Sequence, residues 1–277
     1  MAIITLTTDF GEKDFFAGAV KGAIYSELED VHIVDISHSI SPFNKMEAAY
    51  IIHNAYKNFP VGSIHIIGID NELTPENNHI AVNLDGHYFI CADNGIISLI
   101  TNDIIPSEMV EITIHERKAS NFTLLDVFIK VACHIARGGK LAVIGKTVEE
   151  IQTLRGIRPV VNTSQKHILG NVIYVDNYGN VVSNITQKLF ESIGKGRPFT
   201  IEARGTVINH IHKTYSEAIN FDVDKSQREE DGKKLAIFNT GGYLELAIYK
   251  SNPQTVGSAA TLFGLDYRDA ITINFTN

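Results

Sequence analysis

The stretch Ile3-Ile-Thr-Leu-Thr-Thr-Asp-Phe-Gly11 joins a run of mostly β-branched residues to an aspartate and a glycine. Such a run is typical of a buried strand, and Asp9 stands where that strand ends. In open α/β sheets ligands bind outside the carboxyl ends of the strands, where an acid can accept hydrogen bonds from both hydroxyls of a ribose. The stretch therefore predicts a strand that carries a carboxylate to a binding edge.

The same succession of an apolar run and polar residues returns three more times, in Val31-His-Ile-Val-Asp-Ile-Ser-His38, Ser63-Ile-His-Ile-Ile-Gly-Ile-Asp70 and Tyr88-Phe-Ile-Cys-Ala-Asp-Asn-Gly95. Longer amphipathic segments alternate with these runs, and helices are expected over residues 15–28, 44–58 and 123–137. Alternating strands and helices are typical of βα units. Residues 1–158 are therefore predicted to form an α/β domain with a mainly parallel sheet, and the carboxylate expected at its edge makes this a candidate nucleoside-binding domain.

The pattern changes after Gly156-Ile-Arg-Pro159, because short strands then follow one another with turns between them. Consecutive strands without intervening helices indicate an antiparallel sheet or barrel. A C-terminal antiparallel β-barrel-like domain is predicted for residues 166–277. Its expected strands are 167–175, 180–185, 199–203, 235–238, 243–249 and 270–275.

Composition restricts the classes of function. The net charge of −8 gives no basic surface for a phosphate backbone, so nucleic acid is not an expected partner. Cys91 and Cys133 are too few for a disulfide framework, and no apolar run approaches a membrane span, so we expect a cytoplasmic protein without a membrane partner. Apart from the isolated pair His210 and His212, the histidines lack a ligand spacing, and no metal site is expected.

Several short motifs succeed one another along nearly the whole chain. They are Thr8-Asp-Phe-Gly11 with Lys21-Gly22, Asp35-Ile-Ser-His-Ser-Ile40, Asp93-Asn-Gly95, Ile144-Gly145, Asp176-Asn-Tyr-Gly-Asn180 with Asn184-Ile185, and Gly242-Tyr-Leu-Glu-Leu-Ala247. In this order they resemble the S-adenosyl-L-methionine hydroxide adenosyltransferase family, which is similar in fold to fluorinases and chlorinases.

The resemblance implies a reaction and an assembly. The reaction is displacement at the ribose 5′ carbon of S-adenosyl-L-methionine, which is the substrate, with methionine leaving. The sulfonium is already an excellent leaving group, so the protein has only to orient the nucleophile and exclude bulk water, and no metal or redox cofactor is expected. The implied assembly is a homotrimer whose sites lie between the first domain of one subunit and the second domain of its neighbour.

The resemblance also assigns ligand contacts. Asp9 matches the carboxylate that holds the ribose hydroxyls, and the remaining contacts fall on Phe43, Asp176, Asn180, Tyr215 and Thr240. Structural alternatives stay open: Asp9 can cap a turn, Asp176 to Asn180 can form a hairpin, and the two aromatic rings can pack in a core. Asp35 and His38 are expected to hydrogen-bond loop backbone.

The water-activating residues depart from the family pattern. The family combines an aspartate, an arginine seven residues later and a histidine; here Asp70 is retained, but Asn77 and Thr123 stand at the other two positions. These three residues are the catalytic candidates. The arginine would supply a fixed positive charge, and the histidine is the side chain that titrates nearest neutrality. Without them, we expect hydrolysis to be weakened and ligand binding to be retained.

Three functions follow from this pattern. The leading one is cleavage of S-adenosyl-L-methionine to adenosine and methionine by water or hydroxide. The second is a non-catalytic homotrimer that binds S-adenosyl-L-methionine or adenosine. The third is a halogenase-like enzyme, which Leu124 disfavours because fluorinases carry a serine there. A change to another nucleoside ligand also stays open.

Overall fold

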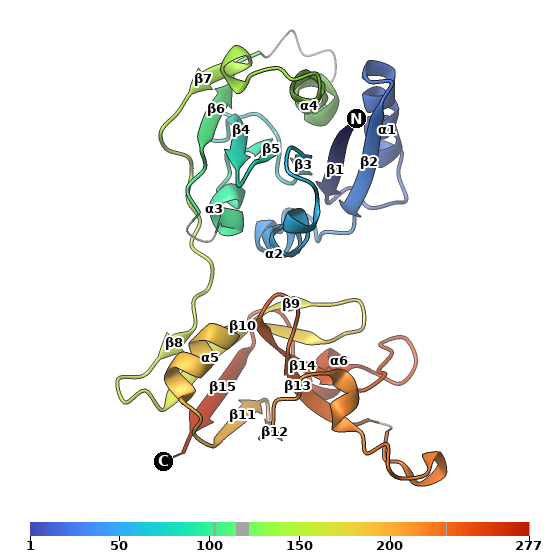
Figure 1. Ribbon diagram of the computed structural model, residues 1–277, viewed down its shortest axis with the longest axis vertical. Helices are drawn as coiled ribbons and strands as arrows, with labels where there is room; N and C mark the ends of the chain where they lie inside the picture. The colour runs from blue at the N-terminus through green and yellow to red at the C-terminus, as the bar shows by residue number, and fades with distance from the viewer. Residues whose placement is uncertain (102–103, 115–121, 231, 277) are drawn as a thin grey trace. The chain divides into compact units, whose positions relative to one another are not determined.

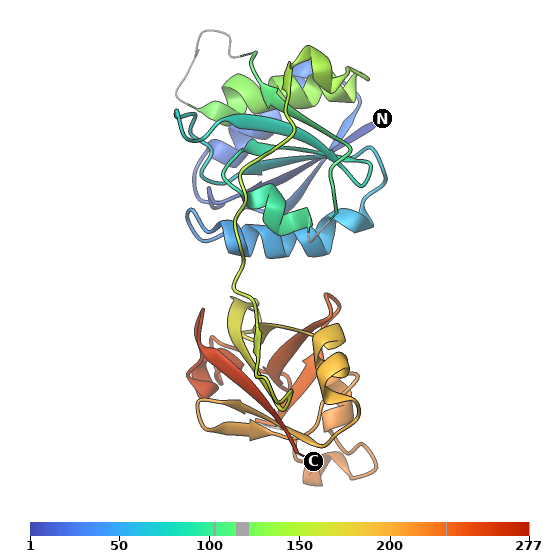
Figure 2. The ribbon, with the colours of Figure 1, turned by 90° about the vertical axis from the view of Figure 1, so that its left-hand side faces the viewer.

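A computed structural model describes residues 1–101, 104–114, 122–230 and 232–276. The chain divides into two compact units, Met1–Gly156 and Ile157–Asn277 (Figures 1 and 2). In the described parts of the chain, no helix combines the length and the apolarity that a membrane crossing needs.

The first unit is built on a seven-stranded sheet in the order β2-β1-β3-β5-β4-β6-β7. The first four strands in that order run parallel to one another, and the remaining pairings are antiparallel. The predicted α/β class is confirmed, with a mixed sheet. The strands are β1 (Ala2–Thr8), β2 (Val31–Ser37), β3 (Ile64–Gly68), β4 (His79–Leu84), β5 (His87–Ala92), β6 (Glu108–Ile112) and β7 (Gly145–Thr147).

Helices cover both faces of this sheet (Figure 1). Successive strand side chains point to opposite faces, so Ile66 packs with the α1 and α4 side while Ile67 packs with the α2 and α3 side. The elements are α1 (Phe16–Glu27), α2 (Lys45–Ala55), the 3₁₀ turn η1 (Tyr56–Asn58), α3 (Ile96–Thr101), the π-helical turn η2 (Leu124–Phe128), α4 (Ile129–Ala136) and the 3₁₀ turn η3 (Leu141–Val143).

The second unit is an antiparallel sheet in the order β12-β11-β15-β9-β10-β14-β13, with β8 paired to β9. Strands β12 and β13, at the two ends of this order, contact each other, so the sheet is nearly closed into the predicted barrel. The strands are β8 (Val160–Val161), β9 (His167–Val175), β10 (Val181–Thr186), β11 (Phe199–Ala203), β12 (Thr206–Ile208), β13 (Lys234–Phe238), β14 (Tyr243–Ile248) and β15 (Ala270–Phe275).

Short helices lie outside this sheet. They are α5 (Gln187–Gly194), α6 (Ala259–Phe263) and the 3₁₀ turns η4 (Tyr215–Ala218) and η5 (Lys225–Gln227). Thr186 caps α5 through its hydroxyl, and Ser258 caps α6 in a reciprocal pair with Thr261.

The buried histidines of the first unit include His65 and His87, whose rings contact each other. His65 is 1% exposed, its Nδ1 lies 2.7 Å from the Thr5 hydroxyl, and its Nε2 lies 3.1 Å from Nδ1 of His87. Its ring stacks on Phe89 at 4.7 Å. Burial, assisted by His87, lowers the pKa of His65 from 6.5 to about 3, so the folded protein holds this ring neutral.

This buried ring predicts acid sensitivity. In the unfolded chain His65 binds a proton near pH 6.5, whereas in the folded chain it does so only near pH 3, so its contribution to stability is complete above pH 6.5 and is lost as the pH falls toward 3. The replacement His65→Gln removes this titration. We expect the slope of the unfolding free energy against pH to fall by about 1.4 kcal/mol per pH unit between pH 6 and 4, measured by urea unfolding.

The control is His32→Gln, because His32 is exposed on β2. It should leave that slope unchanged. Equal slopes in wild-type protein and His65→Gln would show that His65 titrates alike in both states, contrary to its burial.

Candidate active site

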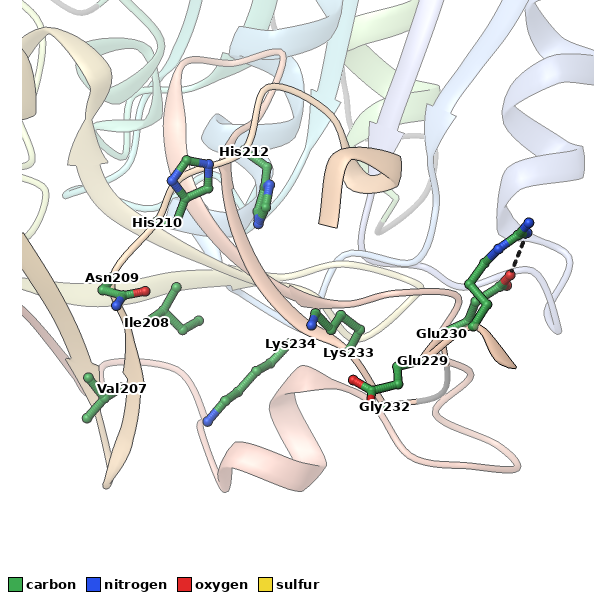
Figure 3. A pocket seen from close by; sticks show the side chains of 11 residues that line it. Val207, Ile208, Asn209, His210, His212, Glu229, Glu230, Gly232, Lys233 and Lys234 are labelled. Atoms are coloured by element: carbon green, nitrogen blue, oxygen red, sulfur yellow. Dashed lines mark hydrogen bonds and ion pairs between the residues drawn. The ribbon is translucent and has the colours of Figure 1, made fainter. Parts of the chain in front are cut away.

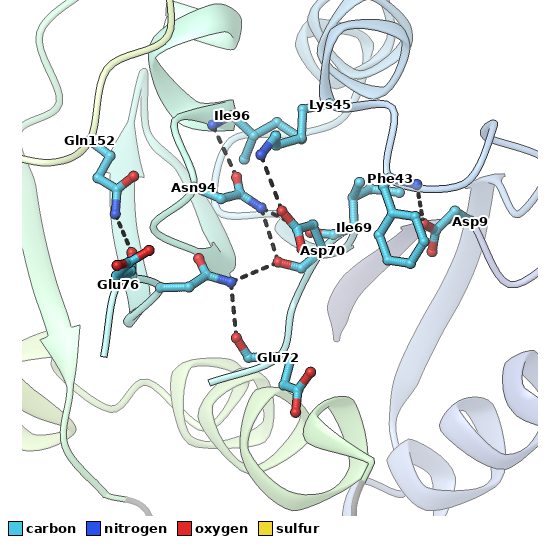
Figure 4. A network of polar contacts seen from close by, with 11 residues as sticks. Asp9, Phe43, Lys45, Ile69, Asp70, Glu72, Glu76, Asn94, Ile96 and Gln152 are labelled. Atoms are coloured by element: carbon cyan, nitrogen blue, oxygen red, sulfur yellow. Dashed lines mark hydrogen bonds and ion pairs between the residues drawn. The ribbon is translucent and has the colours of Figure 1, made fainter. Parts of the chain in front are cut away.

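The candidate site begins at the carboxyl ends of the parallel strands β1 and β3. These strands pair in register from Ile4 with Ile64 to Thr8 with Gly68. Asp9 follows the first strand, and Asp70 follows the second after one residue. Both predicted acids therefore leave the sheet at the same edge (Figure 4).

Asp9 is fixed by the loop that precedes α2. Its Oδ2 accepts a hydrogen bond of 2.8 Å from the backbone N–H of Phe43 (Figure 4). Phe43 has a φ of 61°, and 70% of its surface is exposed, so its ring does not pack in the core of this unit. An ionised carboxylate offers about four acceptor positions, so Asp9 keeps acceptor capacity for a diol after binding Phe43.

Asp70 is held through its backbone. Its φ of 47° lies in the left-handed region, which costs free energy for an aspartate unless neighbouring groups fix it. The Asn77 amide donates to the carbonyls of Asp70 and Glu72, both at 2.9 Å. The Asn94 amide donates to the carbonyls of Ile69 at 3.0 Å and Asp70 at 3.2 Å. Two amides thus stabilise the strained turn that presents the carboxylate.

The carboxylate of Asp70 has a cationic partner. Nζ of Lys45, at the start of α2, lies 3.1 Å from Asp70 Oδ2 (Figure 4). The Lys45 side chain is 27% exposed and that of Asp70 is 40% exposed, so the pair borders the open edge of the sheet. Lys45 could not be recognised from the sequence, because no local pattern links it to a residue 25 positions away. Asn94 lies in the motif Asp93-Asn-Gly95, but the motif does not indicate that its amide binds the backbone of Asp70.

Thr123 precedes the π-helical turn η2 and is half-buried. Its neighbour Leu124 is fully buried and packs over Gly68, where a Cβ would come within 3.1 Å of a Leu124 methyl group. The segment therefore lies over the end of β3. Lys45 and Asn77 hydrogen-bond to Asp70, whereas no hydrogen bond within the described residues joins Thr123 to it.

The expectation for His38 was wrong. Its Nδ1 lies 2.7 Å from the Thr8 hydroxyl and its Nε2 lies 3.1 Å from Asp35, so its side chain bonds side chains and not loop backbone. Partial burial raises the pKa of Asp35, but hydrogen bonds from Lys21 and His38 outweigh it and leave the pKa below its usual value. The three groups tie the end of β2 to the end of β1 and to α1.

In the second unit, Asp176 and Asn180 bind each other. Asp176 accepts from the backbone N–H groups of Tyr178 at 2.9 Å and Asn180 at 2.8 Å, and from the Asn180 amide at 2.9 Å. Gly179 has a φ of 73°, and a Cβ there would lie 2.3 Å from Cβ of Ser258. The loop is therefore a hairpin, as the structural alternative predicts, and Asp176 and Asn180 lie at its centre.

Glu245 lies in the motif Gly242-Tyr-Leu-Glu-Leu-Ala247 but was not among the predicted ligand residues. It is 3% exposed; its Oε1 accepts a 2.6 Å hydrogen bond from the Tyr215 hydroxyl and its Oε2 one of 3.2 Å from Asn239. Burial, with the nearby charge of Asp176, raises the pKa of Glu245 despite these hydrogen bonds. Thr240 lies exposed in the turn that follows Asn239. Glu245 thus connects Tyr215 with the turn that holds Asn239 and Thr240.

The second unit also holds an open pocket of about 670 Å³ (Figure 3). Its lining includes His210, His212, Lys233 and Lys234 together with an Arg228–Glu230 ion pair. None of the predicted ligand residues lines it. The pocket therefore does not belong to the candidate site.

Comparisons with known proteins match both units. The model of the SAM hydroxide adenosyltransferase N-terminal domain matches residues 4–145, and that of the C-terminal domain matches residues 170–272. A protein of Methanocaldococcus jannaschii named (R)-S-adenosyl-L-methionine hydrolase is 31% identical over 98% of this chain and 95% of its own. A fluorinase of Actinopolyspora mzabensis is 23% identical over 88% of this chain and 90% of its own.

The fold has solved counterparts. A crystal structure of an uncharacterized conserved protein from Thermotoga maritima has a TM-score of 0.82, with 24% identity, and covers 98% of this chain and 99% of that one. Fold and site define a two-domain protein with paired acids at the edge of its first sheet. The chain belongs to the SAM hydroxide adenosyltransferase family, as the succession of motifs predicts.

The contact between Tyr215 and Glu245 yields a prediction. The replacement Tyr215→Phe removes the donor and leaves the ring, so the pKa of Glu245 rises further. We expect an unfolding free energy lower by about 1–2 kcal/mol at pH 7, because a hydrogen bond to a charged group is lost. Urea unfolding measures this change.

The control is Tyr249→Phe, because the Tyr249 hydroxyl makes no hydrogen bond within the described residues. It should unfold like wild-type protein. A Tyr215→Phe protein that also unfolds like wild type would contradict the anchoring role of this hydroxyl.

Proposed function

We propose that the protein hydrolyses S-adenosyl-L-methionine to adenosine and methionine. The observation that carries this proposal is the placement of Asp9 and Asp70 at one sheet edge, with the segment 43–45 hydrogen-bonded to both. Asp9 would hold the ribose hydroxyls while Asp70 accepts a hydrogen bond from the attacking water. Family membership and the 31% identical relative named as a hydrolase support the same reaction.

In this reaction the water oxygen forms a bond to the ribose 5′ carbon as the bond from that carbon to the sulfonium sulfur breaks. The bonding electron pair stays on sulfur, which leaves as the neutral thioether of methionine. One water proton passes toward Asp70 and then to solvent. The leaving group needs no activation, so this chemistry calls for no metal or redox cofactor, and the protein contributes orientation and exclusion of bulk water.

The other ligand residues have roles that their chemistry supports. The exposed ring of Phe43 and the 41% exposed ring of Tyr215 offer faces for stacking. Asp176 suits the methionine ammonium, Asn180 a purine edge, and Thr240 adds a hydroxyl. These residues are divided between the two units. As the family resemblance implies, we further propose a homotrimer in which one subunit's first unit and a neighbour's second unit share a site.

Location in the cytoplasm is likewise proposed. Cys91 and Cys133 are free and buried, which fits a reducing compartment. The proposed partner is the nucleoside substrate, without nucleic acid or membrane.

The second candidate is a non-catalytic binder of the same ligand. It is favoured by Asn77, whose amide is engaged with backbone carbonyls and brings no charge to Asp70. A halogenase is disfavoured, because Leu124 stands where fluorinases carry a serine, and its buried apolar side chain offers no hydrogen-bond donor to a halide.

The test is release of adenosine from S-adenosyl-L-methionine by purified protein, measured by chromatography with mass detection. Asp70→Asn should lower kcat by about 100-fold or more, since proton acceptance contributes a factor of about 10² to 10⁴. Asp9→Ala should raise the dissociation constant of adenosine at least about tenfold, through loss of charge-assisted hydrogen bonds. Glu29→Gln, at an exposed position, serves as the control and should behave as wild type.

The two candidate functions give different results. If adenosine forms only at the spontaneous rate while the protein binds its ligand tightly, the protein is a non-catalytic binder and not a hydrolase. If Asp9→Ala binds adenosine as tightly as wild-type protein, Asp9 does not hold the ribose hydroxyls.

A further inference from the structure

We propose that Lys45 is the cation of the water site, holding the attacking water against Asp70. This inference rests on the proposed hydrolysis and adds a residue to it. Its basis is the ion pair between Lys45 and Asp70, with Nζ 3.1 Å from Oδ2.

The backbone fixes where the Lys45 side chain begins. Lys45 is the first residue of α2, and Asn44 before it caps the helix by accepting from the N–H of Glu47. Phe43 donates its N–H to Asp9. A segment of three residues thus contacts one acid through its backbone and the other through the ammonium, so a ribose held by Asp9 and a water held at Asp70 keep a fixed relation.

Within the described residues, Lys45 forms its ion pair with Asp70 and none with the neighbouring acid Glu47. Oε2 of Glu47 accepts from the backbone N–H of Ser41 and from the Asn44 amide, both at 3.1 Å. Asn77 brings an uncharged amide that serves the backbone. Lys45 therefore supplies the positive charge at Asp70 that the residues at 77 and 123 do not carry.

The chemistry of an ammonium suits this role. It has three N–H donors, and the bond to Asp70 uses one. A second can donate to the oxygen of a water that in turn donates its proton to Asp70. Positive charge beside the oxygen favours hydroxide character as the proton leaves. The pair is neutral as a whole, so it does not repel the sulfonium as an unpaired cation would.

The experiment uses purified full-length protein carrying Lys45→Met or Lys45→Arg. Lys45→Met keeps the length of the side chain without its charge, and kcat should fall about 100-fold, as on loss of one preorganised donor. The dissociation constant of adenosine, by calorimetry, should change less than threefold. Lys45→Arg should restore kcat to within about tenfold of wild type, because it restores the charge.

A matched control is Lys146→Met, at an exposed position on β7, which should leave kcat and affinity unchanged. An unchanged kcat in Lys45→Met overturns the proposal while hydrolysis stands. The proposal is also overturned if Lys45→Met loses kcat and adenosine affinity to the same extent. It is overturned as well if Lys45→Arg does not restore kcat. If wild-type protein shows no turnover, the proposed hydrolase function is wrong, and the role of Lys45 in it is wrong as well.

Discussion

The parallel pairing of β1 with β3 is the constraint on which the site depends. Two parallel neighbours end at the same edge, and their register, which closes with Thr8 opposite Gly68, brings Asp9 and Asp70 out together. The loop before α2 then contacts both acids, through Phe43 and Lys45. Phe43 and Asp70 both have left-handed backbone, and such strain persists where surrounding hydrogen bonds determine the conformation.

Much of the fold could be predicted from local pattern. Apolar runs that end in polar residues marked β1, β2, β3 and β5, and turn-separated strands marked the second unit. Strand β4 was missed, although Asp85-Gly86 between β4 and β5 is a strong hairpin signal and both residues have positive φ. The antiparallel half of the first sheet was therefore absent from the prediction. The helix expected over residues 123–137 begins as a π-helical turn, which periodicity does not distinguish.

The site was predictable only where a residue stands at a strand end or in a motif. Asp9 and Asp70 meet both conditions, and the structure places them at one edge. Lys45 lies in no motif, and the motifs that hold Asn94 and Glu245 do not indicate their contacts. All three gain their roles through contacts across the fold. His38 illustrates the opposite error: a turn motif suggested backbone contacts, but pairing of β1 with β2 brings it to the Thr8 hydroxyl.

The most direct test of this account is a crystal structure of the protein with adenosine bound. We predict that the ribose 2′ and 3′ hydroxyls lie within hydrogen-bonding distance of the Asp9 carboxylate. The 5′ hydroxyl, which carries the oxygen delivered by water, should then lie on the side of Asp70. A ribose bound away from Asp9, with its 5′ carbon remote from Asp70, would contradict the account.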